Sequence, residues 1–249
     1  MPFLPPDYEK AVVLIGIGIE RGNCKVDLTP PIVTGFLVAV TSANSGKKHS
    51  LLVTVHYDAV ENASEDLCYW YHTKSGSIKA IPFSSVVDEF GSNWKYIPKD
   101  FDDVAIIPAP FKRGEDAIKA IPMEGFLPMK RVRLGMDVFF LGYPFGTVKT
   151  DNITPFVRKG TISKKDDGDN KIIIDGYSVG GSSGSPVFLK PHFGNKEYNL
   201  DPIAPHFVGM IQGHLNRENT DINLNLAYAL SADKIEEFII SARNEFFPD

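Results

Sequence analysis

The segment that decides the fold is Ile172-Ile-Ile-Asp-Gly-Tyr-Ser-Val-Gly-Gly-Ser-Ser-Gly-Ser-Pro-Val-Phe188. A β-branched apolar run, typical of a buried strand, leads into a turn rich in glycine and serine, and a second apolar run follows. Glycines in such a turn let backbone N–H groups point into a cavity beside a hydroxyl. A serine nucleophile with an oxyanion hole requires this combination.

Two nucleophile motifs overlap in this segment. Gly176-Tyr-Ser178-Val-Gly180 fits G-x-S-x-G, the elbow at which an α/β-hydrolase strand breaks into a helix. Gly181-Ser-Ser183-Gly-Ser-Pro186 fits G-x-S-G-x-P, the nucleophile loop of the chymotrypsin-like fold. The glycines and the proline that follow Ser178 oppose a helix, and the preceding chain has almost no long amphipathic helix. We therefore favour Ser183 as the nucleophile.

Composition is that of an ordinary globular protein. The chain has 249 residues, 43% apolar and 23% charged, which is enough for a sizeable core. A net charge of −5 without a Lys/Arg stripe gives no reason to expect nucleic acid as a partner. Cys24 and Cys68 are too few for a disulfide framework, and we expect both to be thiols. The N-terminus lacks a basic signal region, and the apolar run 11–19 is short, so we expect a cytoplasmic protein without a membrane span.

Short runs rich in Val, Ile and Phe, separated by Pro, Gly, Asn and Asp clusters, predict an all-β protein. The predicted strands are 11–18, 32–40, 50–56, 67–73, 93–97 and 103–107 in the first half, and 136–142, 155–162, 171–175, 185–189, 206–213 and 224–230 in the second. The charged, proline-containing stretch 111–135 fits neither the helical nor the strand periodicity of apolar residues. It resembles a connection between the two halves of the chain. We expect an N-terminal barrel with a short leader in residues 1–115, a linker in 116–134, and a second barrel with a helix in 135–249.

One segment is clearly helical. Ser231 is a good N-cap, and acidic residues in the first turn suit the helix dipole. The predicted apolar stripe, expected to pack against the preceding barrel, is Ile235, Phe238, Ile239, Ala242 and Phe246. The acidic run 166–170 has lysines on both sides, so we interpret it as a polar hairpin turn. No metal and no cofactor is expected.

Candidates for a base and an acid precede the serine loop. His56 ends a strong apolar run, and Asp103 stands at the mouth of another. The chain order His56, Asp103, Ser183 resembles that of the trypsin-like serine proteases, which have the chymotrypsin double β-barrel. The resemblance implies an all-β fold of two six-stranded antiparallel β-barrels, followed by a C-terminal α-helix.

Further motifs extend this resemblance over roughly residues 11–240. Leu141-Gly-Tyr-Pro-Phe-Gly146 and Arg158-Lys-Gly-Thr-Ile-Ser163 are similar to the opening of the second barrel in the high-temperature-requirement (Deg-type) proteases. Val208-Gly-Met-Ile-Gln-Gly213 resembles their strand beside the substrate, and Ala227-Tyr-Ala-Leu230 their closing strand. No PDZ-sized segment follows, so the chain resembles a bare protease module.

The resemblance implies a role for each site residue. Ser183 attacks the peptide, His56 takes its proton, and Asp103 orients the imidazole. The backbone N–H groups of Gly181 and Ser183 form the oxyanion hole. Asp102, one residue earlier, is expected to point to the opposite face of its strand, into solvent.

Specificity and activation are also implied by family position. Tyr177 is expected at the base of the pocket for the P1 side chain, with Gln212, Gly213 and His214 along its wall. No carboxylate stands at that base, which favours a small or apolar P1 residue. Ser182 occupies the position at which zymogen-type members carry an aspartate, so we expect no activation by proteolysis.

One departure leaves two hypotheses open. The family usually has a threonine and two further residues before its histidine, whereas here only Val55 separates Thr54 from His56. Either the local register is shifted or the loop that holds His56 has drifted. The first hypothesis is a serine endopeptidase that acts on peptide or protein substrates. The second is a protease-like scaffold that binds peptides without cleaving them.

Overall fold

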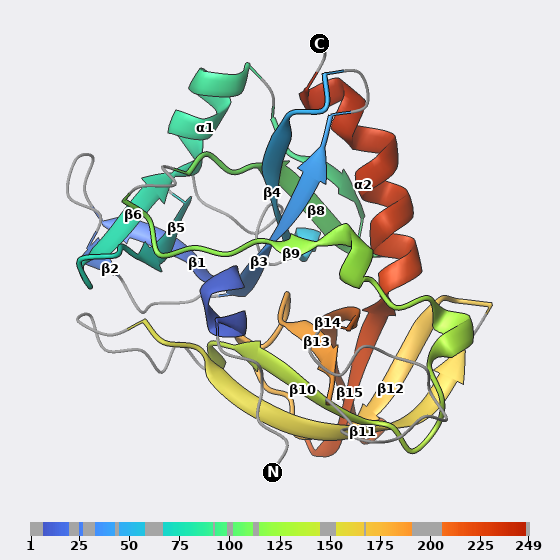
Figure 1. The fold of residues 1–249 in the computed structure, drawn as a ribbon. Coiled ribbons are helices and arrows are strands. Elements are labelled where there is room, and N and C mark those ends of the chain that lie inside the picture. Colours follow the sequence, from blue (N-terminus) through green and yellow to red (C-terminus); the bar gives the residue numbers. More distant parts are fainter. Residues whose placement is uncertain are drawn as a thin grey trace.

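The computed structural model describes residues 7–19, 25–26, 33–42, 45–57, 67–91, 93–98, 102–111, 115–144, 153–166, 168–190 and 206–247. These residues form two β-rich halves that lie against each other, with one long helix beside them (Figure 1). The predicted architecture, mostly β with a C-terminal helix, is confirmed.

The N-terminal half is one antiparallel sheet with a short parallel addition. Its elements are η1 (Tyr8–Ala11), β1 (Val12–Ile19), β2 (Lys25–Val26), β3 (Val33–Thr41), β4 (Lys48–Thr54), β5 (Leu67–His72), β6 (Ile78–Pro82), α1 (Phe83–Phe90), β7 (Lys95–Ile97), β8 (Val104–Pro108) and β9 (Ile121–Pro122). The strand order is β6-β5-β1-β3-β4-β8-β7, with β2 beside β1 and β9 parallel to β3. The described sheet thus has nine strands where six were predicted: β2, β6 and β9 were not predicted, and neither was the helix α1.

The C-terminal half is a closed barrel of the six predicted strands. After η3 (Met123–Gly125) and η4 (Met129–Arg131) come β10 (Asp137–Gly142), β11 (Phe156–Asp166), β12 (Lys171–Asp175), β13 (Pro186–Leu189), β14 (Phe207–Asn216) and β15 (Asn223–Ser231). The closed order is β10-β11-β12-β15-β14-β13. Strands β11 and β12 form an antiparallel hairpin, and its turn residue Asn170 has a φ of 53°. The interpretation of residues 166–170 as a hairpin turn is confirmed.

Alternation along the strands of the first half divides the core in two. Side chains such as Leu14 and Phe36 point to one face of the sheet and join a cluster that also contains Phe207 of the barrel. The rings of Phe36 and Phe207 lie 5.2 Å apart. Their neighbours Val13 and Leu37 point to the other face and join a separate cluster with α1. Because successive strand residues alternate between faces, the same strands both build the first half and bind it to the second.

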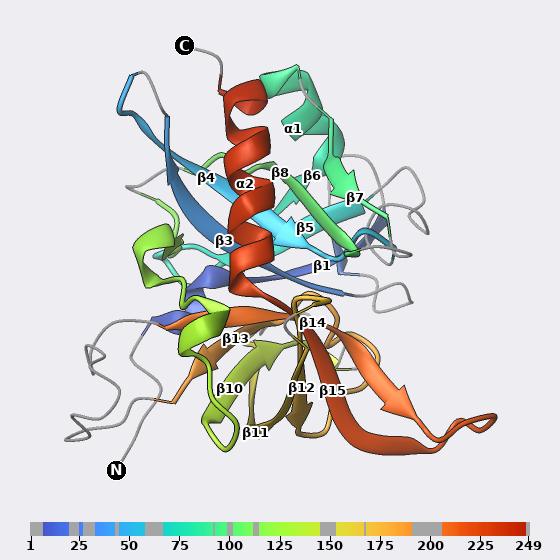
Figure 2. The same cartoon turned by 90° about the vertical axis from the view of Figure 1, so that its right-hand side faces the viewer.

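The C-terminal helix α2 (Ala232–Phe246) connects the two halves. The hydroxyl of Ser231 accepts a hydrogen bond of 3.5 Å from the backbone N–H of Lys234, as expected of an N-cap. We expected the helix to pack on the preceding barrel, but it also lies along β8 of the first half (Figure 2). Just beyond its last turn, the ring of Phe247 stacks on His49 at 3.9 Å. The apolar stripe is long enough to cover both halves, which sequence periodicity alone does not show.

The structure also bears on the expectations for the two cysteines and for a membrane span. Cys68 is buried and forms no disulfide bond, as expected, and Cys24 lies outside the described residues. No helix in the described part of the chain has the length and apolarity needed to cross a membrane.

Candidate active site

The loop between β12 and β13 decides between the two serine motifs. Ser178 is fully buried, and the residues after it form turns rather than a helix. The nucleophile elbow of an α/β-hydrolase would instead present its serine at the start of a helix. The interpretation of Ser178 as such a nucleophile is therefore excluded. Ser183 is partly exposed, and it lies between Gly181 and Gly184, each with a φ of 84°. Both glycines occupy the left-handed region that residues with a Cβ rarely adopt.

Most backbone groups of this loop are used to hold its shape. The N–H of Ser182 donates to the carbonyl of Val179 at 2.9 Å, and that of Gly184 to Ile211 of β14 at 2.7 Å. The N–H groups of Gly181 and Ser183 donate no hydrogen bond to any described residue. These are the two donors predicted for the oxyanion hole. The fold therefore leaves both available to a ligand.

The hydroxyl of Ser183 has one proton, and the structure shows where it points. Its Oγ donates to the carbonyl of Gln212 on β14 at 3.2 Å. A serine hydroxyl is a single donor. In this conformation the proton is therefore directed at β14 and not at an imidazole.

Thr34 on β3 clamps the serine loop to the first half of the molecule. Its N–H donates to the carbonyl of Ser183 at 2.9 Å, and its hydroxyl donates to the carbonyl of Gly181 at 2.8 Å. The same hydroxyl accepts from the N–H of Tyr143 at 3.0 Å. The hydroxyl of Thr54 donates to the carbonyl of Thr34 at 2.8 Å. A chain of hydrogen bonds thus runs from the strand before His56, through Thr34, to Ser183.

Thr34 and Tyr143 are buried where the two halves meet. Burial raises the pKa of the Tyr143 phenol well above its ordinary value, so the hydroxyl stays protonated. It donates to the carbonyl of Ile153 at 2.9 Å. Sequence analysis missed Thr34. The available signal was a hydroxyl in an otherwise apolar run, since a buried polar group needs partners.

Neighbouring strands bring His56 and Asp103 together. Strand β4 ends two residues before His56, β8 begins directly after Asp103, and the two strands pair at Thr54 and Ala105. His56 is 6% exposed and Asp103 is 7% exposed. Asp103 Oδ1 accepts a hydrogen bond of 2.9 Å from the N–H of Tyr57. The predicted base and acid therefore lie at one place in the fold.

The backbone at Asp103 is strained. Its φ is 43°, in the left-handed region, and its N–H donates to the carbonyl of Pro98 at 3.1 Å. Such a conformation costs on the order of 1 kcal/mol and persists only where its surroundings hold it. Strain of this kind is concentrated at functional sites, and here it directs the carboxylate back toward the end of β4.

An aromatic residue that sequence analysis missed covers the imidazole of His56. The ring of Tyr96, on β7, stacks on that of His56 with centroids 4.0 Å apart and planes at 14°. Tyr96 is 50% exposed, so its outer face remains open. The third position after Thr54, which holds the histidine in the family pattern, is Tyr57 here. The backbone N–H of Tyr57, as noted above, contacts Asp103.

Asp102 was expected to point into solvent, but its side chain lies close to helix α2. Its carboxylate lies 3.8 Å from the ammonium of Lys234, and its carbonyl accepts a hydrogen bond from the side chain of Gln212. A hydrogen bond to Glu237 raises the pKa of Lys234, and the charge of Asp102 adds to this. Gln212 thus connects the serine side of the site, through its carbonyl, with the aspartate side, through its amide.

The predicted P1 region lies along β14 and the start of the serine loop. Tyr177 is exposed, and the guanidinium of Arg158 lies 5.2 Å from its ring centre while donating to its carbonyl at 2.8 Å. A side chain at Gly213 would require the ring of Tyr228 to shift, since an added Cβ would lie 2.7 Å from its hydroxyl. His214 follows on the same strand, paired with Ala227. The roles of these residues in specificity stay predictions.

The closed barrel, the second sheet and the C-terminal helix define the chymotrypsin-like double-barrel fold. One solved structure that the chain resembles is the inactive form of a serine-to-alanine mutant of Rv3671c from M. tuberculosis, with a TM-score of 0.52 and 14% identity. The match covers 94% of this chain and 86% of that one. At this identity the likeness shows the fold. No protein-family model and no curated protein matches the sequence.

Proposed function

We propose that this protein is a serine endopeptidase in which Ser183 is the nucleophile, His56 the general base and Asp103 its orienting acid. The observation that carries the proposal is the serine loop itself. The N–H groups of Ser182, Gly184 and Ser185 donate within the fold, whereas those of Gly181 and Ser183, which flank Ser182, donate to no described residue. A turn held by these bonds, with unused N–H groups on both sides of Ser182 and a hydroxyl on Ser183, suits the stabilisation of an oxyanion.

The proposed reaction has two stages. Ser183 Oγ attacks the peptide carbonyl carbon while His56 takes the hydroxyl proton, and the carbonyl oxygen becomes an oxyanion that accepts from the two N–H groups. The C–N bond then breaks, and His56 returns the proton to the leaving amine. Water attacks the acyl-enzyme by the same route, which releases the acid and restores Ser183. Asp103 stays ionised and holds the imidazole.

The first step requires a rotation of one side chain. Ser183 Oγ donates to Gln212 in the structure, so its O–H has to turn away from that carbonyl before it can donate to His56. Serine rotamers are separated by small barriers, and catalytic hydrogen bonds often tighten only when substrate is bound. The backbone clamp by Thr34 leaves this rotation free, because it uses the carbonyl of Ser183 and not its hydroxyl.

Cleavage products test the proposal directly. Wild-type protein and Ser183→Ala would be incubated with an unfolded protein such as reduced casein, and new termini would be mapped by mass spectrometry. We expect internal cuts, with small or apolar P1 residues enriched, that are absent with Ser183→Ala. Internal cuts that persist in Ser183→Ala would contradict the assignment of the nucleophile.

Tyr96 is expected to act as a positioning residue for His56. Removing its ring in Tyr96→Ala should lower kcat about tenfold with little change in KM, because the imidazole loses the surface that fixes its plane. Tyr96→Phe keeps the ring and should retain most of the activity. Steady-state kinetics on one peptide substrate give both constants. Equal rates for all three proteins would show that the stack has no part in catalysis.

A second function is favoured by two observations at the same site. The position of the family histidine holds Tyr57, and the Ser183 proton is bonded to Gln212. A scaffold without a working base would bind peptides and release them intact, for example by strand addition along β14. In the casein experiment this alternative predicts no new termini, together with saturable binding that is the same for wild type and Ser183→Ala.

A further inference from the structure

Two glycines give the serine loop a conformational freedom that the rest of the fold has to restrict. Gly181 and Gly184 both have a φ of 84°. A glycine reaches left-handed and right-handed conformations at similar cost, so a peptide unit that begins at Gly181 can turn over with little steric penalty. An oxyanion hole needs one orientation only, because its N–H groups have to point at the same oxygen. Hydrogen bonds to the loop therefore decide which orientation is populated.

The peptide unit between Gly181 and Ser182 is held at both ends. Its carbonyl accepts from the hydroxyl of Thr34 at 2.8 Å, and its N–H donates to the carbonyl of Val179 at 2.9 Å. The carbonyl and the N–H of a trans peptide unit point in opposite directions, so turning the unit over would break both bonds. Val179 belongs to the same loop, whereas Thr34 belongs to β3 of the other half. Thr34 is thus the partner that fixes this unit against a separate part of the fold.

The peptide unit between Ser183 and Gly184 is held in the same way. Its carbonyl accepts from the backbone N–H of Thr34 at 2.9 Å, and its N–H donates to the carbonyl of Ile211 on β14 at 2.7 Å. The N–H of Ser183 belongs to the unit between these two, so Thr34 holds the backbone on both sides of this donor. The side chain of Thr34 makes one of the two bonds, and its main chain makes the other. Only the first bond depends on which residue stands at position 34.

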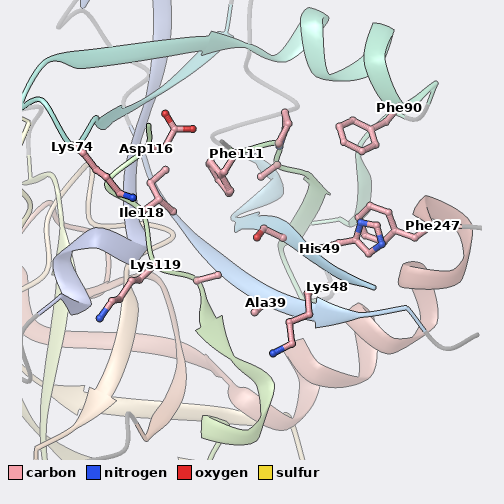
Figure 3. A pocket seen from close by; sticks show the side chains of 14 residues that line it. Ala39, Lys48, His49, Lys74, Phe90, Phe111, Asp116, Ile118, Lys119 and Phe247 are labelled. Carbon is pink, nitrogen blue, oxygen red and sulfur yellow. The ribbon is translucent and has the colours of Figure 1, made fainter. Parts of the chain in front are cut away.

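Thr34 is itself firmly placed. It pairs with Leu14 of β1, and residues 36–41 of the same strand pair with β4. Further along β3, Ala39 lines a cavity of about 680 Å³ that shares no residue with the serine loop (Figure 3). The Thr34 side chain is fully buried, and its hydroxyl accepts from the N–H of Tyr143 at 3.0 Å. With one bond donated and one accepted, the direction of this hydroxyl is set.

We propose that the hydroxyl of Thr34 is a positioning group for the oxyanion hole. It selects the orientation of the Gly181–Ser182 peptide unit in which the N–H groups of Gly181 and Ser183 face one point. The inference rests on the proposed hydrolase function, since an oxyanion forms only in that reaction. Without the hydroxyl, the unit would populate both orientations, and fewer molecules would have both donors in place. The first half of the molecule would thus support the transition state without touching the substrate.

Thr34→Val tests the role of the hydroxyl, because valine has nearly the shape of threonine but no donor. We expect kcat for peptide cleavage to fall at least about tenfold with KM within about twofold of wild type, since the oxyanion contacts form only in the transition state. Thr34→Ser keeps the hydroxyl and should retain most of the wild-type kcat. Tyr143→Phe is the matched control, because it removes another buried hydroxyl bond, to Ile153 at 2.9 Å, and keeps the backbone N–H that contacts Thr34. Its kcat should equal that of the wild type.

Amide hydrogen exchange, followed by NMR at single residues, tests the same claim without a substrate. In Thr34→Val the N–H of Ser182 should exchange at least about tenfold faster, because turning its unit over breaks the bond to Val179. The N–H of Gly184 should keep its wild-type rate, because its unit is still held by the main chain of Thr34. A general loosening of the loop would instead accelerate exchange at both positions.

Four results would overturn the inference. These are equal kcat for Thr34→Val and the wild type, a loss in Thr34→Ser as large as in Thr34→Val, unchanged exchange at Ser182, or equally faster exchange at Ser182 and Gly184. If the wild type itself cleaves no peptide, the proposed function fails, and exchange at Ser182 still decides whether Thr34 sets the peptide unit. Melting temperatures show whether each variant is folded. Thr34→Ala removes the same hydroxyl with a smaller side chain, so it gives the same test if the valine variant does not fold.

Discussion

Replacing Ser183 with alanine is expected to lower kcat/KM for peptide cleavage by at least about 10³-fold. The loss follows from the proposed covalent step, because no acyl-enzyme forms without Oγ, and residual activity would come only from substrate binding and the oxyanion donors. The substrate would be a fluorogenic peptide whose P1 residue is the one enriched at the casein cleavage sites. Initial rates of the wild type and Ser183→Ala on this peptide would give the ratio.

Ser178→Ala is the control for the Ser183 prediction. Ser178 is fully buried, and its hydroxyl has no hydrogen-bond partner among the described residues. Removing a buried hydroxyl without partners costs little, so this variant should fold and cleave like wild type. The pair also separates the two overlapping motifs, because a nucleophile elbow would show the opposite result. Loss of activity in Ser178→Ala with retention in Ser183→Ala would exclude our assignment.

Gly184→Ala is expected to have the largest effect on stability. An added Cβ would lie 1.8 Å from the carbonyl oxygen of Thr34 and 2.9 Å from the hydroxyl of Thr54, and the residue has a φ of +84°. The serine loop could not keep its place against β3, so the clamp between the halves would open. We expect a loss of more than about 4 kcal/mol, a size that single substitutions reach only through such a defect. Urea unfolding followed by fluorescence would measure it.

Gly135→Ala measures the cost of the backbone strain in the absence of a steric clash. Gly135 has a φ of +82°, almost that of Gly184, but nothing lies within 4 Å of its added Cβ. The strain alone should cost about 1–2 kcal/mol. Similar losses for Gly135→Ala and Gly184→Ala would mean that the close approach to Thr34 does not determine stability.

Local patterns predicted the serine loop and the C-terminal barrel because each depends on residues close together in the chain. The six barrel strands are regular apolar runs between turn residues, and all six are found. His56 and Asp103 could be placed at strand ends for the same reason. Their neighbourhood follows from the antiparallel pairing of β4 with β8.

The unpredicted parts depend on contacts between distant segments. Thr34 meets the serine loop across the junction of the two halves, and Tyr96 reaches His56 from another strand, so neither role is visible in local sequence. Helix α1 is only eight residues long. Its apolar positions Phe83, Val86, Val87 and Phe90 do follow helical spacing, which is the signal that was overlooked.

The most direct test of the central claim is covalent labelling by a fluorophosphonate probe, with the modified residue identified by mass spectrometry. The proposed mechanism predicts a single adduct on Ser183 in the wild type, and labelling that is at least about tenfold slower in His56→Ala, because the base no longer activates the hydroxyl. Absence of any adduct on Ser183, or labelling at the same rate with and without the imidazole, would contradict the claim that these two side chains act together.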